Sequence, residues 1–315
     1  MKDSFGRQIN YLRVSVTDFC NFRCSYCMPE EGVVAKKREE ILTLEELYTI
    51  IQLFVQMGVS KVRLTGGEPM LRPGLLGLIY SLSRLEKLDD LAMTTNASLL
   101  KDQARQFKEA GLKRVNISLD SLKPDVFNKL TRSELAPVLQ GIDAAIECGL
   151  KVKINVVLLK GINEEEIEDL AALTLDRPID VRFIELMPLG DRADFSIEHY
   201  LSCKSVLDRL DLIEEENHEK SSPATLYRYG NGLGRVGLIR SLSCSFCGEC
   251  NRLRLSSDGK LRPCLHSDYF VDLLTPLRRG ENLVPYILEA LEKKPLHHLL
   301  NEGHRTKESM HRIGG

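Results

Sequence analysis

The chain has 315 residues, 43% hydrophobic and 28% charged, as is ordinary for a globular protein of about two domains. Its net charge of −2, its 6% aromatic content and its lack of Trp argue against non-specific nucleic-acid binding, and no apolar run reaches the ~18 residues of a membrane span. The N-terminal MKDSFGRQIN has no apolar signal core, and the nine cysteines are an odd number. We therefore expect a cytoplasmic protein whose thiols bind metal or react, with no nucleic-acid or membrane partner.

Short β-like runs alternate with helical stretches from Tyr11 to about Pro188. One such helix, Leu44–Met57, begins with a capping box of Thr43 and Glu46. Strands that alternate with helices predict a parallel sheet of the α/β class, and no dinucleotide-binding fingerprint follows the first strand. Six units are too few for an eight-stranded barrel, so we expect a partial, TIM-type (β/α)6 barrel. The expected strands are Leu12–Thr17, Lys61–Thr65, Leu91–Thr95, Val115–Asp120, Val152–Leu159 and Asp180–Met187.

Three cysteines, Cys20, Cys24 and Cys27, follow the first expected strand in the run DFCNFRCSYCMP. A 4Fe–4S cluster is fully ligated by four cysteines, so three leave one iron open, and an open coordination position is typical of a catalytic site. A structural zinc ion would need a fourth ligand nearby, yet the first histidine of the chain is His199. The spacing therefore favours a catalytic iron–sulfur cluster over a zinc site.

The sequence pattern changes beyond about Phe195. An acidic, helix-like stretch over Tyr200–Asn217 leads into the polar linker EKSSPAT, and short β-like pieces and helices follow. Domain boundaries fall in such linkers. We therefore expect residues 1–218 to form the partial barrel and residues 219–315 to form an α+β domain that caps its mouth.

The second part contains four further cysteines, Cys244, Cys247, Cys250 and Cys264. All four could close a zinc site or a fully ligated cluster, or the last three alone could hold a cluster with another open iron. The spacing does not decide between these two interpretations.

Several segments together resemble a known family. CNFRCSYC and the later GGEP are similar to motifs of the radical S-adenosylmethionine (SAM) superfamily. Within it, the chain resembles the MoaA family, the GTP 3′,8-cyclases of molybdenum cofactor biosynthesis. The matching segments are LRVSVTDFCNFRCSYCMP, KVRLTGGEP, TTNA, NISLDSL, KINVVLLKGIN, RFIELMPLG, FCGECNRLRLSSDGKLRPCL and the terminal IGG.

For the first cysteine set, the resemblance implies a 4Fe–4S cluster whose open iron binds the amino and carboxylate groups of SAM. An electron from this cluster would release a 5′-deoxyadenosyl radical. Gly66 and Gly67 would let the strand edge approach SAM closely, and Glu68 would anchor its cationic amino group. The residues expected to bind SAM are Tyr26, Gly67, Glu68, Ser118 and Met187.

For the second set, the resemblance implies an auxiliary 4Fe–4S cluster held by Cys247, Cys250 and Cys264, with Cys244 outside it. The spare iron would meet the guanine base of GTP. The triphosphate would need several cations, and Arg252 and Arg254 share one face of an expected strand directly after Cys250. The residues expected to contact GTP are Arg13, Lys61, Arg63, Thr94, Lys153, Arg182, Arg252, Leu253 and Arg254.

The last two residues, Gly314 and Gly315, would be dismissed as a frayed end without the resemblance. The family ends in the same way, which implies that this tail enters the active site, so we count both glycines as catalytic residues together with Cys20, Cys24 and Cys27.

The resemblance implies the following reaction. The radical would abstract hydrogen from ribose carbon 3′, and the new radical would attack guanine carbon 8, giving (8S)-3′,8-cyclo-7,8-dihydroguanosine 5′-triphosphate. A reductant such as flavodoxin or ferredoxin would supply electrons, and cyclic pyranopterin monophosphate synthase would take the product. The family suggests a homodimer, although no feature of the sequence requires one. The alternative is a radical SAM enzyme with an auxiliary cluster that acts on a peptide.

Overall fold

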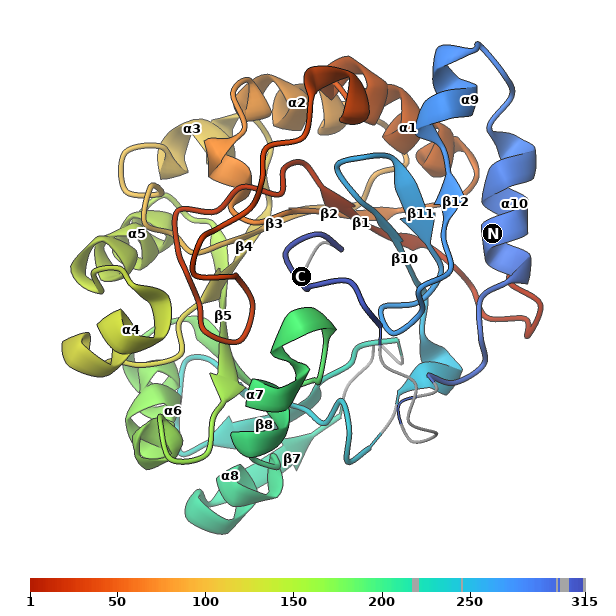
Figure 1. The fold of residues 1–315 in the computed structure, drawn as a ribbon. Helices are drawn as coiled ribbons and strands as arrows, with labels where there is room; N and C mark the ends of the chain where they lie inside the picture. Colours follow the sequence, from red (N-terminus) through yellow and green to blue (C-terminus); the bar gives the residue numbers. More distant parts are fainter. Residues whose placement is uncertain (217–220, 245, 299, 301–305, 314–315) are drawn as a thin grey trace.

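A single sheet forms the centre of the molecule. The computed structural model describes residues 1–216, 221–244, 246–298, 300 and 306–313. Within these residues the sheet has twelve strands in the order β12-β11-β10-β1-β2-β3-β4-β5-β6-β9-β8-β7. It curves around a central space, with helices on its outer face (Figure 1). The prediction of an α/β fold with a largely parallel sheet is confirmed.

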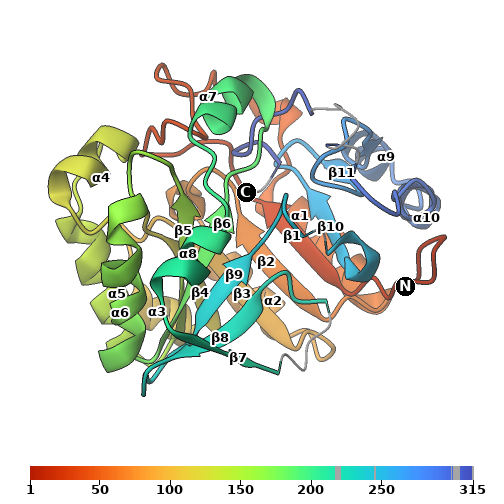
Figure 2. The same cartoon turned by 90° about the horizontal axis from the view of Figure 1, so that it is seen from below.

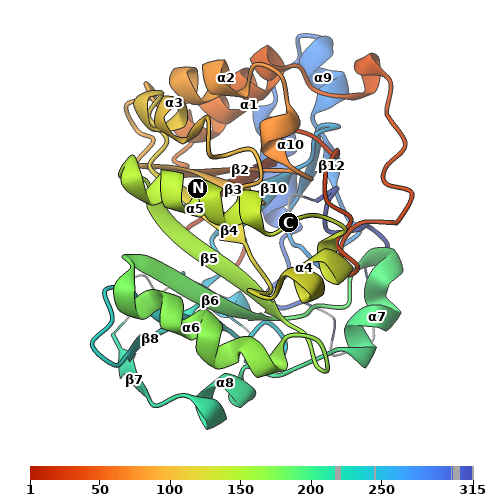
Figure 3. The ribbon, with the colours of Figure 1, turned by 90° about the vertical axis from the view of Figure 1, so that its left-hand side faces the viewer.

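The first six strands follow one another in the sheet in chain order, and each neighbouring pair is parallel. Figure 3 shows α5 and α6 in front of β5 and β6, on the outer face. The strands are β1 (Tyr11–Ser15), β2 (Lys61–Thr65), β3 (Asp90–Thr95), β4 (Arg114–Ser118), β5 (Lys151–Leu158) and β6 (Ile179–Glu185). The helices between them are α1 (Leu44–Gln56), α2 (Leu75–Leu82), α3 (Ala104–Glu109), α4 (Pro124–Thr131), α5 (Ala136–Glu147) and α6 (Ile167–Asp176).

Helix α1 begins where the sequence predicted. The Thr43 hydroxyl accepts a hydrogen bond from the Glu46 amide at 3.1 Å, and the Glu46 carboxylate accepts one from the Thr43 amide at 2.8 Å. This reciprocal pair satisfies two amide donors at the start of the helix.

Some strands end earlier than the sequence predicted. β4 ends at Ser118 rather than Asp120, and β6 ends at Glu185 rather than Met187. Beyond β4, the Asp120 carbonyl accepts a hydrogen bond from the Asn163 side chain at 2.7 Å instead of continuing the strand ladder. Asp120 and Met187 therefore lie on loops at the carboxyl edge of the sheet.

Strands from the second half of the chain extend the sheet at both ends. β10 (Arg252–Leu255) pairs in parallel with β1, and β9 (Val236–Ile239) pairs in parallel with β6, an arrangement that Figure 2 shows from below. The remaining strands are β7 (Leu212–Glu215), β8 (Thr225–Tyr229), β11 (Lys260–Arg262) and β12 (Val271–Asp272), and the remaining α-helices are α7 (Ala193–Glu198), α8 (Lys204–Arg209), α9 (Leu274–Arg278) and α10 (Val284–Glu292). The second half is thus built into the same sheet as the six predicted units. The expected boundary after residue 218 falls between the paired strands β7 and β8.

The expected helical stretch over Tyr200–Asn217 is only partly helical, so this prediction was wrong in its second half. α8 covers Lys204–Arg209, whereas Leu212–Glu215 form β7. The cause is tertiary: β8 offers backbone hydrogen bonds to this segment, which the local acidic pattern does not reveal.

Alternate residues of the strands face the interior of the curved sheet. On β5, Ile154 and Val156 are buried toward the helices, whereas Lys153, Asn155 and Val157 are half-buried on the other face. The apolar outer face joins the helices in one core. The inner face carries the polar side chains, and it forms the cavity described next.

Candidate active site

A cavity of about 360 Å³ lies inside the curve of the sheet, and its wall brings together most of the residues singled out in the sequence. Glu68, Lys61, Lys153 and Leu253 are not on this wall, and Gly314 and Gly315 lie outside the described residues. The expected residues on the wall are Cys20, Cys24, Cys27, Cys247, Cys250, Cys264, Tyr26, Gly67, Ser118, Met187, Arg13, Arg63, Thr94, Arg182, Arg252 and Arg254.

The two cysteine sets lie at opposite ends of this cavity. The first set follows the carboxyl end of β1. Cys250 lies two residues before Arg252, the amino end of β10, and β10 runs parallel to β1. Cys264 follows β11, which is antiparallel to β10 and so returns to the same end. The inner faces of the strands line the cavity between the two cysteine sets.

The loop of the first set is fixed by a tight turn and by α4. The amides of Cys27 and Met28 both donate to the Cys24 carbonyl at 2.9 Å. The amides of Arg23 and Ser25 donate to carbonyls at the end of α4, at 2.8 and 2.9 Å. These hydrogen bonds fix the backbone that carries the three thiols.

Burial favours the protonated form of the thiols of the first set. Burial raises the pKa of Cys20 to about 11, and burial with the charge of the Cys20 thiolate raises the pKa of Cys27 to about 12. Among the described residues, no three His, Cys, Asp or Glu side chains converge on a point where one metal ion would be held. A 4Fe–4S cluster is larger and takes each thiolate on a separate iron, in exchange for the thiol protons. Three half-buried thiols on one wall fit that group.

Asp120 is a wall residue that the sequence did not single out individually. Its carboxylate accepts a hydrogen bond from the Tyr26 hydroxyl at 2.6 Å and another from the Val157 amide at 2.8 Å. Burial raises the pKa of Asp120 to about 6, although both hydrogen bonds act in the opposite direction. Asp120 thus fixes Tyr26, between Cys24 and Cys27, against β5. The signal that could have identified Asp120 in the sequence is its position just beyond the carboxyl end of β4.

The Gly-Gly-Glu segment has a structural reason for its glycines in addition to the one expected. A Cβ on Gly67 would lie 2.3 Å from the Phe19 carbonyl oxygen, and one on Gly66 would lie 2.3 Å from the Thr17 oxygen. The missing side chains therefore let the loop that leads to Cys20 pass close by. The expectation from sequence was close approach of SAM.

Glu68 is 1% exposed and does not itself line the cavity. Its carboxylate accepts hydrogen bonds from the Thr95 hydroxyl at 2.8 Å, from the Asn96 amide at 2.7 Å and from the Met70 amide at 3.1 Å. Burial raises the pKa of Glu68 to about 7. Thr95 and Asn96 are themselves on the wall, so Glu68 supports it from behind.

The second cysteine set lies among cations. Burial disfavours the Cys250 thiolate, but Arg252 and Lys294 outweigh this effect and lower the pKa of Cys250 to about 6. Burial raises the pKa of Cys264. Cys244 is exposed and is not on the cavity wall. Three wall cysteines, one of them ready to ionise, fit a cluster with an open iron.

Arginines occupy the middle of the cavity. Burial and the charge of Arg63 lower the pKa of Arg182 to about 10, and burial and the charge of Arg252 lower that of Arg254 to about 10. Among the described residues, several buried polar atoms on the wall lack a hydrogen-bond partner, namely Arg63 Nε, Arg182 Nε, Arg252 Nη2, Thr94 Oγ1 and both side-chain atoms of Asn116. All of these atoms except Asn116 Oδ1 can donate a hydrogen bond, and unpartnered buried donors are costly, so this surface suits a polar anion that would engage them.

The expected contact residues that are not on the wall differ in their positions. Leu253 faces the opposite side of β10 from Arg252 and Arg254 and is fully buried in the core. Lys61 is half-buried at the amino end of β2. The Lys153 ammonium lies 3.1 Å from Asp180 Oδ2. Burial and Arg182 lower the pKa of Lys153 to about 8, against the attraction of Asp180.

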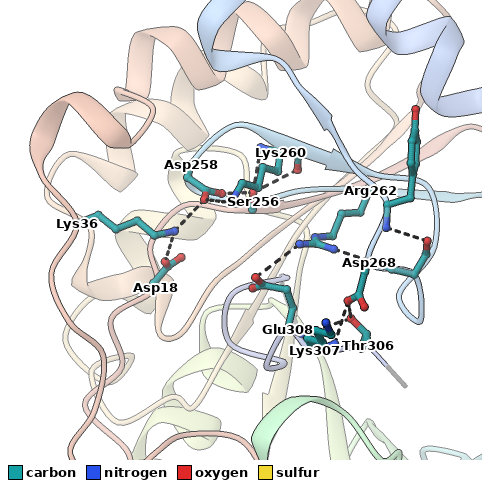
Figure 4. A network of polar contacts seen from close by, with 12 residues as sticks. Asp18, Lys36, Ser256, Asp258, Lys260, Arg262, Asp268, Thr306, Lys307 and Glu308 are labelled. Atoms are coloured by element: carbon teal, nitrogen blue, oxygen red, sulfur yellow. Dashed lines mark hydrogen bonds and ion pairs between the residues drawn. The ribbon is translucent and has the colours of Figure 1, made fainter. Parts of the chain in front are cut away.

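The chain returns to the cavity near its carboxyl end. Met310 lines the wall, the His311 ring contacts the Cys27 carbonyl at 3.1 Å, and Arg254 donates to the Ile313 carbonyl at 3.4 Å. Figure 4 shows how this tail is attached: Asp268 accepts from the Thr306 hydroxyl at 2.7 Å and from the Lys307 amide at 2.9 Å. The described tail thus ends beside the first cysteine set.

A second network in Figure 4 attaches the first cysteine loop to the β10–β11 hairpin. The Lys36 ammonium lies 3.0 Å from both Asp18 and Asp258, and the Ser257 hydroxyl donates to Asp18 at 2.5 Å. The hairpin therefore holds both the loop and the tail.

Two family models match the chain, the Radical SAM superfamily over residues 14–174 and Molybdenum Cofactor Synthesis C over residues 179–300. A GTP 3′,8-cyclase of Peptoclostridium acidaminophilum is 50% identical over 318 residues, which cover 99% of this chain and 98% of that protein. The GTP 3′,8-cyclase of Alkaliphilus oremlandii is 48% identical and covers 100% of both chains. The chain belongs to the GTP 3′,8-cyclase family. In this GTP 3′,8-cyclase family member, the match to the first family model ends at residue 174 and the match to the second begins at residue 179.

Solved structures share the fold of this GTP 3′,8-cyclase family member. Streptococcus suis SuiB bound to S-adenosylmethionine matches with a TM-score of 0.59 and 17% identity, over 90% of this chain and 68% of that chain. SuiB bound to the precursor peptide SuiA matches with a TM-score of 0.56 and 16% identity, over 96% and 76%. At this identity the likeness shows the fold alone. In the part of the chain that the structure describes, no helix is long and apolar enough to cross a membrane.

Proposed function

We propose that this chain is a radical SAM GTP 3′,8-cyclase, which converts GTP to (8S)-3′,8-cyclo-7,8-dihydroguanosine 5′-triphosphate in the first step of molybdenum cofactor biosynthesis. Its cofactors are two 4Fe–4S clusters and SAM. The observation that carries the proposal is one cavity with a cysteine triplet at each end and arginines between them. Full-length relatives of that name support it.

At the first end, Cys20, Cys24 and Cys27 hold a cluster with an open iron. Gly67, Ser118 and Met187 form the neighbouring wall for SAM, with Tyr26 fixed by Asp120. Glu68 acts from behind, by accepting hydrogen bonds from the Thr95 hydroxyl and the Asn96 amide. When bound, these cofactors supply one-electron chemistry that amino-acid side chains cannot perform.

At the other end, Cys247, Cys250 and Cys264 hold the second cluster and the guanine base lies beside it. Arg13, Arg63, Arg182, Arg252 and Arg254 grip the triphosphate. Fixing GTP by both its base and its phosphates orients the ribose toward the first end. Orientation is the main contribution the protein makes here, because a radical formed away from its target would react elsewhere.

Further expectations stay with this proposal. Lys61, Lys153 and Thr94 also contact GTP, and Leu253 contributes its backbone. Residues 1–218 form a partial (β/α)6 barrel, and residues 219–315 form the domain that carries the second cluster and caps the barrel mouth.

We place the protein in a reducing cytoplasm, since all nine cysteines are free thiols. A flavodoxin or ferredoxin, a homodimeric partner and cyclic pyranopterin monophosphate synthase are the expected protein partners.

The decisive experiment is anaerobic incubation of the reconstituted protein with SAM, GTP and a strong reductant. We expect 5′-deoxyadenosine and the cyclised nucleotide to form together, both dependent on GTP. If 5′-deoxyadenosine forms only at a rate that GTP does not change, the substrate assignment is wrong. A peptide that stimulates the same cleavage would favour the alternative radical SAM function.

A further inference from the structure

Two buried cations contact the segments that carry the second cysteine set, and the proposed function uses neither of them. One is Lys294, which follows α10 and is 3% exposed. Its ammonium donates to the Pro263 carbonyl at 2.6 Å, to the Arg252 carbonyl at 2.8 Å and to Cys250 Sγ at 3.6 Å. An ammonium has three donors, so all of them are used. Lys294 thus joins the segment of Cys250 to the residue that precedes Cys264.

The other cation is Arg7, in the segment before β1. Its guanidinium donates to the Cys247 carbonyl at 2.7 Å, to the Pro295 carbonyl at 2.8 Å and to the Leu296 carbonyl at 3.1 Å. Its Nε is held by Asp3 Oδ2 at 2.6 Å. Arg7 therefore joins the segment of Cys247 to the residues that follow Lys294.

These contacts connect segments that the sheet does not hold together. β10 and β11 fix the chain from Arg252 to Arg262, whereas Cys247, Cys250 and Cys264 all lie outside those strands. Among the described residues, no carboxylate pairs with Lys294, although a buried cation needs compensation. The side chain with which its ammonium makes contact is the thiol of Cys250.

We propose that Lys294 and Arg7 form a clamp that holds the three cysteine segments in place for the second cluster. This inference rests on the proposed two-cluster function. Both are positioning residues, because they act through the cysteine segments. Lys294 has an additional effect, since a hydrogen bond to a ligand sulfur and a nearby positive charge both stabilise the reduced cluster. It therefore raises the reduction potential of the second cluster.

The test compares Lys294→Met with Lys293→Met, a matched change at the exposed neighbouring lysine. Iron and sulfide are counted per chain after anaerobic reconstitution, and circular dichroism monitors folding. We expect wild type and Lys293→Met to hold roughly eight irons and Lys294→Met to hold roughly four, because only the second cluster is lost. Lys294→Met with the full iron content and an unchanged potential would overturn the proposal.

The potential is measured where only the second cluster remains, in chains that also carry Cys20→Ser, Cys24→Ser and Cys27→Ser. There, any cluster retained by Lys294→Met should titrate at a more negative potential than that of Lys293→Met. If Lys294→Met does not fold, the Arg7→Lys variant tests the clamp instead, because lysine keeps the positive charge but lacks the forked guanidinium group of arginine. Iron loss confined to the second site supports the clamp, and full retention overturns it. A wild-type chain with only roughly four irons would contradict the two-cluster function itself.

Discussion

Arg13 of β1 and Arg254 of β10 occupy paired positions on neighbouring parallel strands, and both line the cavity. Arg63 of β2 is paired with Arg13 on its other side, so three arginines stand in a row across three strands. Burial lowers the pKa of Arg13, and the charge of Arg254 lowers it further. The like charges of this row repel one another, which supports the proposal that a multiply charged anion binds here.

Arg63→Met should weaken GTP binding and leave the GTP-free protein at least as stable as wild type. We expect the dissociation constant to rise about 10- to 100-fold, because a hydrogen bond to a charged group contributes about 1.5–3 kcal/mol. The melting temperature without GTP should stay or rise, since a buried cation among like charges is removed. Calorimetry and thermal unfolding measure both effects. Arg105→Met, at an exposed position on α3, is the control, and unchanged affinity in Arg63→Met would place the triphosphate elsewhere.

Cys264→Ser and Cys244→Ser should differ in iron content. Cys264 is on the cavity wall and Cys244 is exposed outside it, so only the first is expected to be a ligand. We expect Cys264→Ser to lose roughly four irons per chain and Cys244→Ser to lose none. Iron analysis and electron paramagnetic resonance of the reduced proteins check this. Loss of iron from Cys244→Ser would make Cys244 a ligand.

Local patterns explain what could be predicted from sequence. The cap of α1 depends on Thr43 and Glu46, three residues apart. The shared face of Arg252 and Arg254 follows from the alternation of side chains along a strand. The family motifs predicted which cysteines bind the clusters, a question that spacing alone left open for the second set.

Contacts between distant segments could not be predicted in this way. Arg7 contacts Cys247, which lies 240 residues away, and nothing near either residue indicates the pairing. The hydrogen bonds that the Glu68 carboxylate accepts from Thr95 and Asn96 could likewise not be predicted from the motif. The placement of the two cysteine sets at opposite ends depends on β10 joining β1, a pairing that the order of elements does not imply.

Asp268→Ala should release the tail without affecting either cluster. Asp268 holds Thr306 and Lys307 through one carboxylate oxygen, and the tail beyond them contacts the first cysteine loop. We expect faster hydrogen exchange over residues 306–313, faster carboxypeptidase digestion and slower cyclisation, with full iron content. Asp211→Ala, at an exposed carboxylate, is the control. Exchange rates equal to those of the control would show that Asp268 does not hold the tail.

Gly190→Ala should disturb the same tail at Ser309. A Cβ on Gly190 would lie 2.8 Å from backbone atoms of Ser309, and the residue has a φ of +53°. Deletion of Gly314 and Gly315 should likewise stop cyclisation and leave both clusters in place. Each variant is checked by comparing iron content with product formation, and iron loss from either would mean that the tail supports a cluster.

The affinity for GTP should fall as the pH rises above about 8, the value to which burial and Arg182 lower the pKa of Lys153. The triphosphate favours the charged lysine, so above this pH binding must be accompanied by proton uptake. The expected loss approaches about tenfold per pH unit, since one proton is linked to binding. Lys153→Arg keeps its charge and should give a flatter profile between pH 7 and about 10. Calorimetry in buffers of different ionisation enthalpy measures the proton uptake directly. Equal pH profiles for the wild type and Lys153→Arg would remove Lys153 from the residues that bind GTP.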